Sequence, residues 1–143
     1  MNSLNHKYYG TLLLSLKCQK TVNGINAAKP ILVISIIDYL SIESNCDNTF
    51  DYKRLGEIYN HNRTKMGCTT PFYYPAYHLQ SDGFWHLVWK DGMTPSGKSD
   101  KYLRENVICG MIDDSLWNIL QDKEQRDHYR DLVYRHYLEN KNQ

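Results

Sequence analysis

A long apolar run in the first third of the chain constrains the fold most. Residues 31–42 are mostly apolar, with Asp38 as their only charged residue, and they directly follow Pro30. Proline is common in the first turn of a helix, and twelve residues is long for a strand, so we expect a buried helix over residues 30–41. A buried strand is the alternative, because the run is rich in β-branched Ile and Val. The run is too short and too polar to span a membrane.

A strand signal surrounds an Asp-Gly pair further along the chain. Residues 77–90 read YHLQSDGFWHLVWK, in which strand-forming residues flank a Ser-Asp-Gly turn at 81–83. Asp-Gly between such segments is a strong hairpin signal, so we expect a β-hairpin over residues 77–90. Alternation along its second strand places Trp85, Leu87 and Trp89 on one face.

Helices are expected around these strands. Asp51 is a typical N-cap for a helix over about 52–62. Apolar spacing predicts a first helix over 3–18, with Leu4, Tyr8, Leu12 and Leu16 on its inner face. Further elements are expected at 99–105 (helix), 107–112 (strand), 114–120 (helix) and 122–139 (helix). Residues 63–76 are expected to be irregular. Together these elements predict a single α+β domain over residues 1–143, with a small antiparallel sheet packed against about five to six helices.

The charge distribution excludes one class of DNA-binding protein. Seventeen basic and sixteen acidic residues give a net charge of +1. The chain therefore does not bind nucleic acid through its overall charge, as a histone-like protein does. Residues 1–104 carry a net charge of +4 and residues 105–143 a net charge of −3. Residues 1–37 and 58–81 contain basic residues and no acid, and they predict a local basic face for a phosphate backbone. An ordinary solvated surface is the alternative.

Motifs for catalysis and for metal binding are absent from the sequence. No P-loop, G-x-G-x-x-G or G-x-S-x-G motif occurs, and no C-x-x-C pair, since the cysteines lie more than 20 residues apart. The string Asn60-His61-Asn62 is better explained as a polar helix end than as part of a nuclease site. We therefore expect a binding module with no metal or other cofactor, in a cytoplasmic protein with free thiols.

Aromatic residues gather beside one of the acid-free segments. Three of the 12 tyrosines lie in residues 73–78 (YYPAYH), which follow Arg63 and Lys65. Aromatic rings interleaved with positive charge suit a nucleic-acid surface, and packing in the core is the alternative.

Three segments resemble a known family. They are Lys29-Pro30 with the apolar run behind it, the block Tyr74–Trp85 (YPAYHLQSDGFW), and the helix beginning Lys101-Tyr102-Leu103 ahead of Asp113–Trp117. These patterns are similar to the sulfur-binding domain of phosphorothioate-dependent restriction endonucleases, and the resemblance covers roughly residues 10–138. In that family the domain usually precedes an HNH nuclease domain.

The resemblance implies binding of double-stranded DNA in which sulfur replaces one non-bridging phosphate oxygen. It assigns Tyr74, Pro75 and the side chain of His78 to an apolar sulfur pocket, and it places Lys29 and Lys101 at basic positions near the phosphate. Two residues depart from the pattern. Ala28 stands where the family often has His, and His78 stands where some members carry a small residue.

Charge adds further candidates and leaves other functions open. From the acid-free stretches we expect Lys20, Arg63 and Lys65 to contact the DNA backbone. Residues that read the DNA bases are expected in the loops over 61–70 and 91–100.

Any cleavage would come from a nuclease domain or subunit outside these residues. The alternatives are a metal-dependent nuclease using His61, His78 or His86, a DNA-binding domain without sulfur preference, and a protein-interaction domain using the acidic C-terminal helices.

Overall fold

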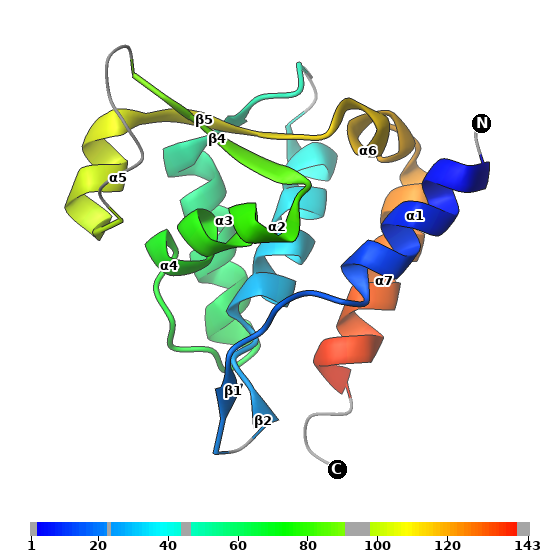
Figure 1. Ribbon diagram of the computed structural model, residues 1–143, viewed down its shortest axis with the longest axis horizontal. Helices are drawn as coiled ribbons and strands as arrows, with labels where there is room; N and C mark the ends of the chain where they lie inside the picture. The colour runs from blue at the N-terminus through cyan, green and yellow to red at the C-terminus, as the bar shows by residue number, and fades with distance from the viewer. Residues whose placement is uncertain (1–2, 23, 44–46, 91–97, 140–143) are drawn as a thin grey trace.

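The computed structural model describes residues 3–22, 24–43, 47–90 and 98–139 (Figure 1). The helices are α1 (Ser3–Leu13), α2 (Ala28–Ile42), α3 (Tyr52–Lys65), α4 (Tyr73–His78), the 3₁₀ helix η1 (Leu79–Asp82), α5 (Asp100–Asn106), α6 (Asp114–Ile119) and α7 (Lys123–Tyr137). The strands are β1 (Lys20–Thr21), β2 (Gly24–Ile25), β3 (Phe50–Asp51), β4 (Trp85–Trp89) and β5 (Val107–Ile112). The expected α+β class is confirmed.

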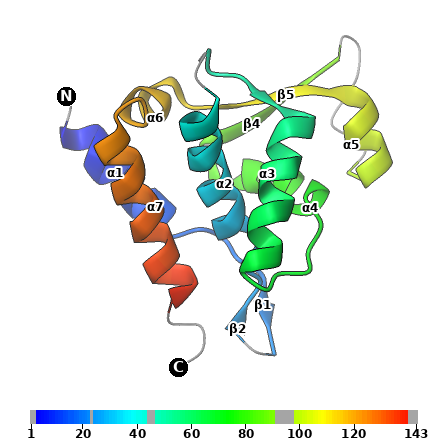
Figure 2. The ribbon, with the colours of Figure 1, turned by 180° about the vertical axis from the view of Figure 1, so that it is seen from behind.

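Helix α2 forms the centre of the molecule, as its apolar sequence predicts. It packs between α3 on one side and α7 on the other (Figure 2). Most of its side chains are buried, and its polar groups have partners. The Ser35 hydroxyl donates to the Ile31 carbonyl at 2.7 Å, and the Asp38 carboxylate accepts from Arg130 Nε of α7 at 2.7 Å. The helix alternative for this run is therefore the right one, and Asp38 faces a cation on a neighbouring helix.

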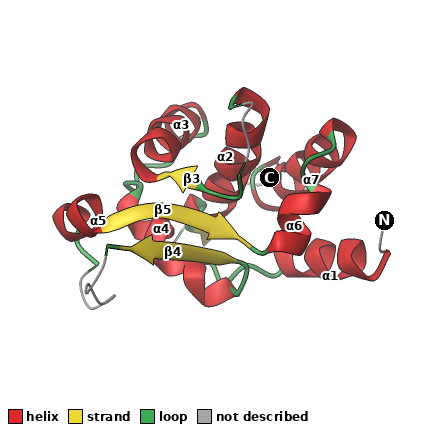
Figure 3. Ribbon diagram, turned by 90° about the horizontal axis from the view of Figure 1, so that it is seen from above, coloured by secondary structure: helices red, strands yellow, loops and turns green. Residues whose placement is uncertain are grey.

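The sheet differs from the expected hairpin. Residues 77–82 are helical, because α4 and η1 occupy them, and β4 pairs instead with β5 in an antiparallel sheet of order β3-β5-β4 (Figure 3). Gly83 has φ 98° and ends η1, so the Asp-Gly pair terminates a helix and does not turn a hairpin. The Asp82 side chain is buried in contacts with the chain near the N-terminus, which a solvent-facing turn would not allow. Trp85 and Leu87 are buried, as alternation predicts.

The first helix is shorter than expected and presents a different face. It ends at Leu13, and its buried residues are Tyr9 and Leu13, whereas Leu4 and Tyr8 are 73% and 57% exposed. Of the other two residues of the expected face, Leu12 packs partly buried against the core, and Leu16, beyond the end of the helix, is buried. Tertiary hydrogen bonds explain the rotation. Tyr9 Oη donates to Asp113 at 2.9 Å, and the Tyr137 hydroxyl of α7 donates to the Leu13 carbonyl at 2.6 Å.

Most remaining elements match the expectations. Asp51 caps α3 by accepting from the Arg54 backbone N–H at 2.8 Å, and α5, β5, α6 and α7 lie within a few residues of their predicted bounds. The segment over 63–76 is only partly irregular, since α3 continues to Lys65 and α4 begins at Tyr73. Strands β1 and β2 form a small antiparallel pair, and residue 23 between them lies outside the described residues. No helix in the described part of the chain is long and apolar enough to cross a membrane.

A substitution at Gly110 can test how tightly the sheet packs. It lies on β5 opposite Leu87, and a Cβ added there would stand 2.0 Å from Cη2 of the buried Trp85 indole. We expect Gly110→Ala to lower the free energy of unfolding by roughly 1–3 kcal/mol, because the indole must move in a packed core. Gly10→Ala is the control, since nothing lies within 4 Å of its added Cβ, and it should not destabilise. Urea denaturation compares the two, and equal stabilities would contradict this packing.

Candidate functional site

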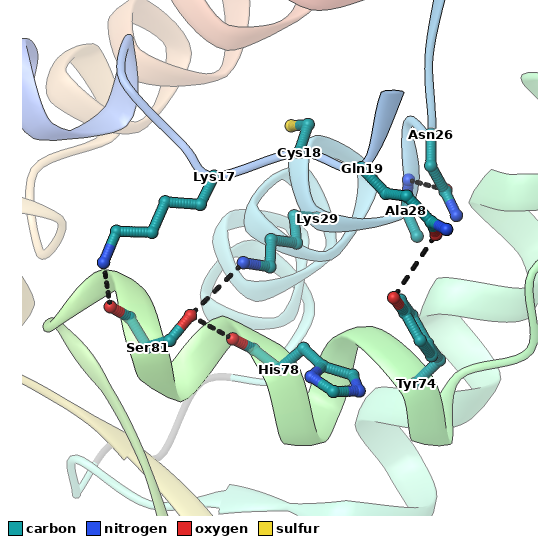
Figure 4. Close-up of a pocket in the computed structure, with 9 residues that line it drawn as sticks. All are labelled: Lys17, Cys18, Gln19, Asn26, Ala28, Lys29, Tyr74, His78 and Ser81. Carbon is teal, nitrogen blue, oxygen red and sulfur yellow. Dashed lines mark hydrogen bonds between the residues drawn. The ribbon is translucent and has the colours of Figure 1, made fainter. Parts of the chain in front are cut away.

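A pocket of about 290 Å³ opens where α2 begins. Three segments far apart in the sequence line it (Figure 4): the chain after α1, the start of α2 with the residues before it, and one side of α4 with η1. The lining residues are Lys17, Cys18, Gln19, Asn26, Ala28, Lys29, Tyr74, His78 and Ser81.

Aromatic rings from α4 form one wall of the pocket. Tyr74 and His78 are one helical turn apart, so they share a face, and their ring centroids lie 4.3 Å apart. The Tyr74 hydroxyl donates to Gln19 Oε1 at 3.3 Å across the opening. Pro75 is buried behind this wall and does not line the pocket. The indole N–H of Trp85 donates to the Ala76 carbonyl at 2.9 Å, which fixes α4 against the sheet.

The opposite wall contributes small and weakly polar groups. Ala28 adds only a methyl group, and its backbone N–H donates to Asn26 Oδ1 at 2.9 Å. Burial raises the pKa of the Cys18 thiol to about 11, so this group is uncharged at neutral pH. The N-terminal end of α2 also opens here, where the helix dipole favours an anion. The pocket thus combines these apolar groups with the polar side chains of Lys17, Gln19, Asn26 and Ser81, beside a weakly positive helix end.

A buried ion pair lies at the edge of the pocket. Lys29 Nζ is 2.7 Å from Asp82 Oδ2, and the two side chains are only 9% and 1% exposed. The other oxygen of Asp82 accepts from the Lys17 backbone N–H at 2.8 Å. Lys17 Nζ reaches the Ser81 carbonyl at 3.0 Å and is solvent-exposed. The sequence identified Lys29 but missed this partner, because Asp82 was assigned to a hairpin turn.

His78 is a neutral wall of the pocket at pH 7. Burial lowers the pKa of its imidazole below the ordinary value of 6.5, and the ammonium groups of Lys98 and Lys29 lower it further. Lys98, which precedes α5, is a second cation that the sequence interpretation did not single out. Its effect on His78 places positive charge beside the α4 wall.

The structure brings only part of the predicted set to this pocket. Lys29, Tyr74 and His78 line it, whereas the other predicted cations lie outside it. Arg63 donates to Asn60 Oδ1 at 2.8 Å and to the Cys68 carbonyl at 3.3 Å, and it lines a separate groove with residues of α3 and α5. The remaining cations, Lys20 on β1, Lys65 at the end of α3 and Lys101 on α5, are exposed.

Two other expectations concern the histidines of a nuclease site and the base-reading loop over 91–100. The histidines considered for a nuclease lie on three different elements, and His86 binds Asp113 at 2.9 Å. Within the described ranges, no group of three or more His, Cys, Asp and Glu side chains could hold a metal ion. Of the expected base-reading loop over 91–100, residues 91–97 lie outside the described residues.

Two solved structures share this architecture. The sulfur-binding domain of SprMcrA complexed with phosphorothioated DNA superposes with a TM-score of 0.70, at 18% sequence identity, over 95% of this chain and 86% of that chain. The sulfur-binding domain of ScoMcrA complexed with phosphorothioated DNA gives a TM-score of 0.71 at 11% identity, over 90% of this chain and 86% of that chain. The chain has the fold of a sulfur-binding domain. No protein-family model and no curated protein matches the sequence.

The sulfur-binding-domain fold was expected from three short segments, and it extends over nearly the whole chain. At 18% and 11% identity, the likeness lies in the arrangement of the elements, while most side chains differ. What the pocket of this chain binds must therefore be argued from its own residues.

The electrostatics of the pocket can be tested through His78. Lys98→Gln should raise the pKa of the His78 imidazole. It removes the ammonium group that lowers this pKa more than Lys29 does. Lys101→Gln makes the same charge change on exposed α5 and should leave this pKa unchanged. An NMR titration of the imidazole signals measures both. A His78 midpoint at or above 6.5 in the wild-type protein would contradict the described environment.

Proposed function

We propose that this chain binds double-stranded DNA carrying a backbone phosphorothioate, with the sulfur held in the pocket between α2 and α4. The observation that carries the proposal is the convergence of Lys29, Tyr74 and His78 on one pocket. Sequence resemblance had assigned Tyr74 and His78, with Pro75, to the sulfur pocket and Lys29 to a basic position near the phosphate. The fold supports it as well, since both solved neighbours were complexed with phosphorothioated DNA.

The walls of the pocket suit sulfur better than oxygen. Sulfur is larger, more polarisable and less strongly hydrated than a phosphate oxygen, so it enters an apolar concavity at a smaller desolvation cost. An oxygen there loses water and gains no equivalent hydrogen bond from the Tyr74 ring, the Ala28 methyl group or the neutral Cys18 thiol. A discrimination of about 1–3 kcal/mol is reasonable for a polar group buried without a partner.

The two departures from the family pattern alter the pocket without closing it. His78 narrows the space beside Tyr74, yet a volume of about 290 Å³ remains open. Its neutral ring supplies either an apolar face or one N–H donor. Ala28 removes a polar side chain, and the α2 N-terminus remains as a source of positive potential.

Cations around the pocket supply affinity that does not depend on sulfur. Lys17 and Lys20 lie on the chain between α1 and β2, and Lys98 lies close enough to His78 of the α4 wall to lower its pKa. We assign Lys20, Lys101, Arg63 and Lys65 to the surrounding DNA backbone, where each contact releases a counterion and adds salt dependence. Pro75 supports the wall from behind.

This binding activity fits the recognition module of a cytoplasmic restriction system directed at modified DNA. A nuclease domain or partner subunit would then perform cleavage. The best alternative is a DNA-binding domain without sulfur preference, which the exposed cations alone could provide.

Matched duplexes test the proposal. Fluorescence anisotropy with two duplexes that differ by a single phosphorothioate should give about tenfold tighter binding of the modified duplex, which corresponds to about 1.4 kcal/mol. Equal affinities would leave only the general DNA-binding alternative. Binding of neither duplex would exclude both.

Tyr74 should control the sulfur preference. Tyr74→Ala opens the pocket to water without removing charge, so the preference should fall toward unity while binding of the unmodified duplex changes little. Tyr74→Phe loses only the hydroxyl bond to Gln19 and should keep the preference. Tyr134→Ala, on the exposed face of α7, is the matched control. If Tyr74→Ala kept the full preference, the sulfur would bind elsewhere.

Lys20 should control affinity without affecting preference. Lys20→Gln should weaken binding of both duplexes by the same factor and reduce the slope of log K against log salt by about 0.9, because one phosphate contact is lost. Lys123→Gln makes the same charge change on α7, away from the pocket, and should leave the slope unchanged. Titrations at several salt concentrations measure the slopes, and an unaltered slope for Lys20→Gln would remove this residue from the interface.

A further inference from the structure

We propose that Asp82 is a specificity-determining residue of the pocket, which acts by neutralising Lys29. The inference rests on the proposed function and deepens it. Asp82 prevents Lys29 from offering an unshared positive charge to an ordinary phosphate oxygen, while Lys17 remains as an exposed cation at the pocket.

The contacts of Asp82 commit its whole carboxylate to the residues around the pocket. Oδ2 accepts from Lys29 Nζ at 2.7 Å, and Oδ1 accepts from the backbone N–H of Lys17 at 2.8 Å. The side chain is 1% exposed, so water does not screen either contact. One carboxylate therefore holds the start of α2 and the chain after α1 against η1.

Lys29 consequently differs from a free phosphate-binding lysine. Of its three N–H donors, one is held by Asp82, and a second faces Ser81 Oγ at the longer distance of 3.5 Å. The ammonium and carboxylate charges cancel, so the pair presents a dipole to the pocket. A charge-assisted hydrogen bond from an unpaired ammonium would be about twice as strong as a neutral one.

The balance of charge has a direct consequence for selectivity. An unpaired ammonium would compensate the cost of desolvating a phosphate oxygen. It would stabilise bound sulfur less, because sulfur is more weakly hydrated and accepts weaker hydrogen bonds. With Lys29 held by Asp82, the apolar walls decide between the two atoms. Asp82 thus lowers affinity for unmodified DNA more than affinity for modified DNA, and the ratio of the two affinities rises.

Asp82→Asn tests this inference with little change of shape. The amide oxygen can still accept from the Lys17 backbone N–H, and the negative charge is lost. The amide NH₂ that replaces Oδ2 cannot accept from Lys29, so the ammonium is released from this contact. We expect affinity for the unmodified duplex to rise about tenfold, since a charged hydrogen bond becomes available to it. Affinity for the modified duplex should rise less, so the preference falls. The salt slope for the unmodified duplex should steepen by about 0.9, because Lys29 becomes an additional phosphate contact.

Asp38→Asn provides a matched control. Asp38 lies on α2 and, like Asp82, forms an ion pair; its partner is Arg130 Nε at 2.7 Å. Its replacement by Asn makes the same change in net charge. It is nine residues from Lys29 along the helix, or about 13 Å. The ratio and the salt slope of Asp38→Asn should match those of the wild-type protein. If Asp38→Asn reproduced the Asp82→Asn effects, overall charge would explain them and the inference would fail.

A double variant keeps the inference testable if Asp82→Asn alone does not fold. Lys29→Met with Asp82→Asn removes both charges together, and circular dichroism establishes whether it folds. If the pair presents no net charge, the double variant should retain the wild-type ratio and salt slope. A slope flattened by about 0.9 would instead identify Lys29 as a direct phosphate contact and overturn the inference.

The outcomes separate this inference from the proposed function. If Asp82→Asn binds both duplexes with the wild-type ratio and slope, or weakens both equally with a lower melting temperature, Asp82 has only a structural role. If the wild-type protein shows no sulfur preference, the proposed function fails. Even then, a steeper salt slope of Asp82→Asn on unmodified DNA would support the neutralisation of Lys29, and an unchanged slope would overturn it.

Discussion

The site depends on one buried ion pair, between Lys29 and Asp82. Burying two charges is unfavourable unless they meet each other and their remaining hydrogen-bonding groups find partners. Here the carboxylate also accepts from the Lys17 backbone, so three segments must come together for the charges to be satisfied. Loss of either partner would leave an uncompensated charge at 9% exposure or less. The pair therefore fixes the relative positions of α2, η1 and the chain after α1, which are the segments that line the pocket.

Helix α4 holds the other wall in place by contacts with the sheet. Its carbonyl at Ala76 accepts from the Trp85 indole, and that indole lies against Gly110 of β5, where no side chain intervenes. The wall formed by Tyr74 and His78 is thus supported by the central strand. This arrangement suits a pocket that selects by shape and hydration, since such selection requires walls that do not yield to a larger or more polar group.

The sequence predicted elements best where local signals agreed with burial. The apolar run after Pro30, the Asp51 cap and the strand over 107–112 each depend on residues close together in the chain, and each is confirmed. The hairpin was wrong because Asp-Gly is equally able to end a helix, and here the distant Lys17 and Lys29 hold the Asp82 side chain in the helical arrangement. The inner face predicted for the first helix was wrong at Leu4 and Tyr8 for the same reason. Its rotation follows hydrogen bonds to Asp113 and Tyr137, more than 100 residues away.

The candidate site shows the same division between local and distant information. Resemblance supplied Tyr74, His78 and Lys29 as separate positions, and the structure places all three on one pocket. The resemblance could not predict whether the charge of Lys29 is compensated, because that depends on contacts between residues far apart in the sequence. Counting Lys29 as a free cation would describe a phosphate site that favours oxygen. Counting it with Asp82 describes a pocket in which the Lys29 charge is compensated, Lys17 remains as an exposed cation, and apolar groups lie beside a helix N-terminus. A buried acid beside a DNA-binding surface would ordinarily weaken binding, and in the function proposed for this chain that loss of affinity is what would make binding selective for sulfur.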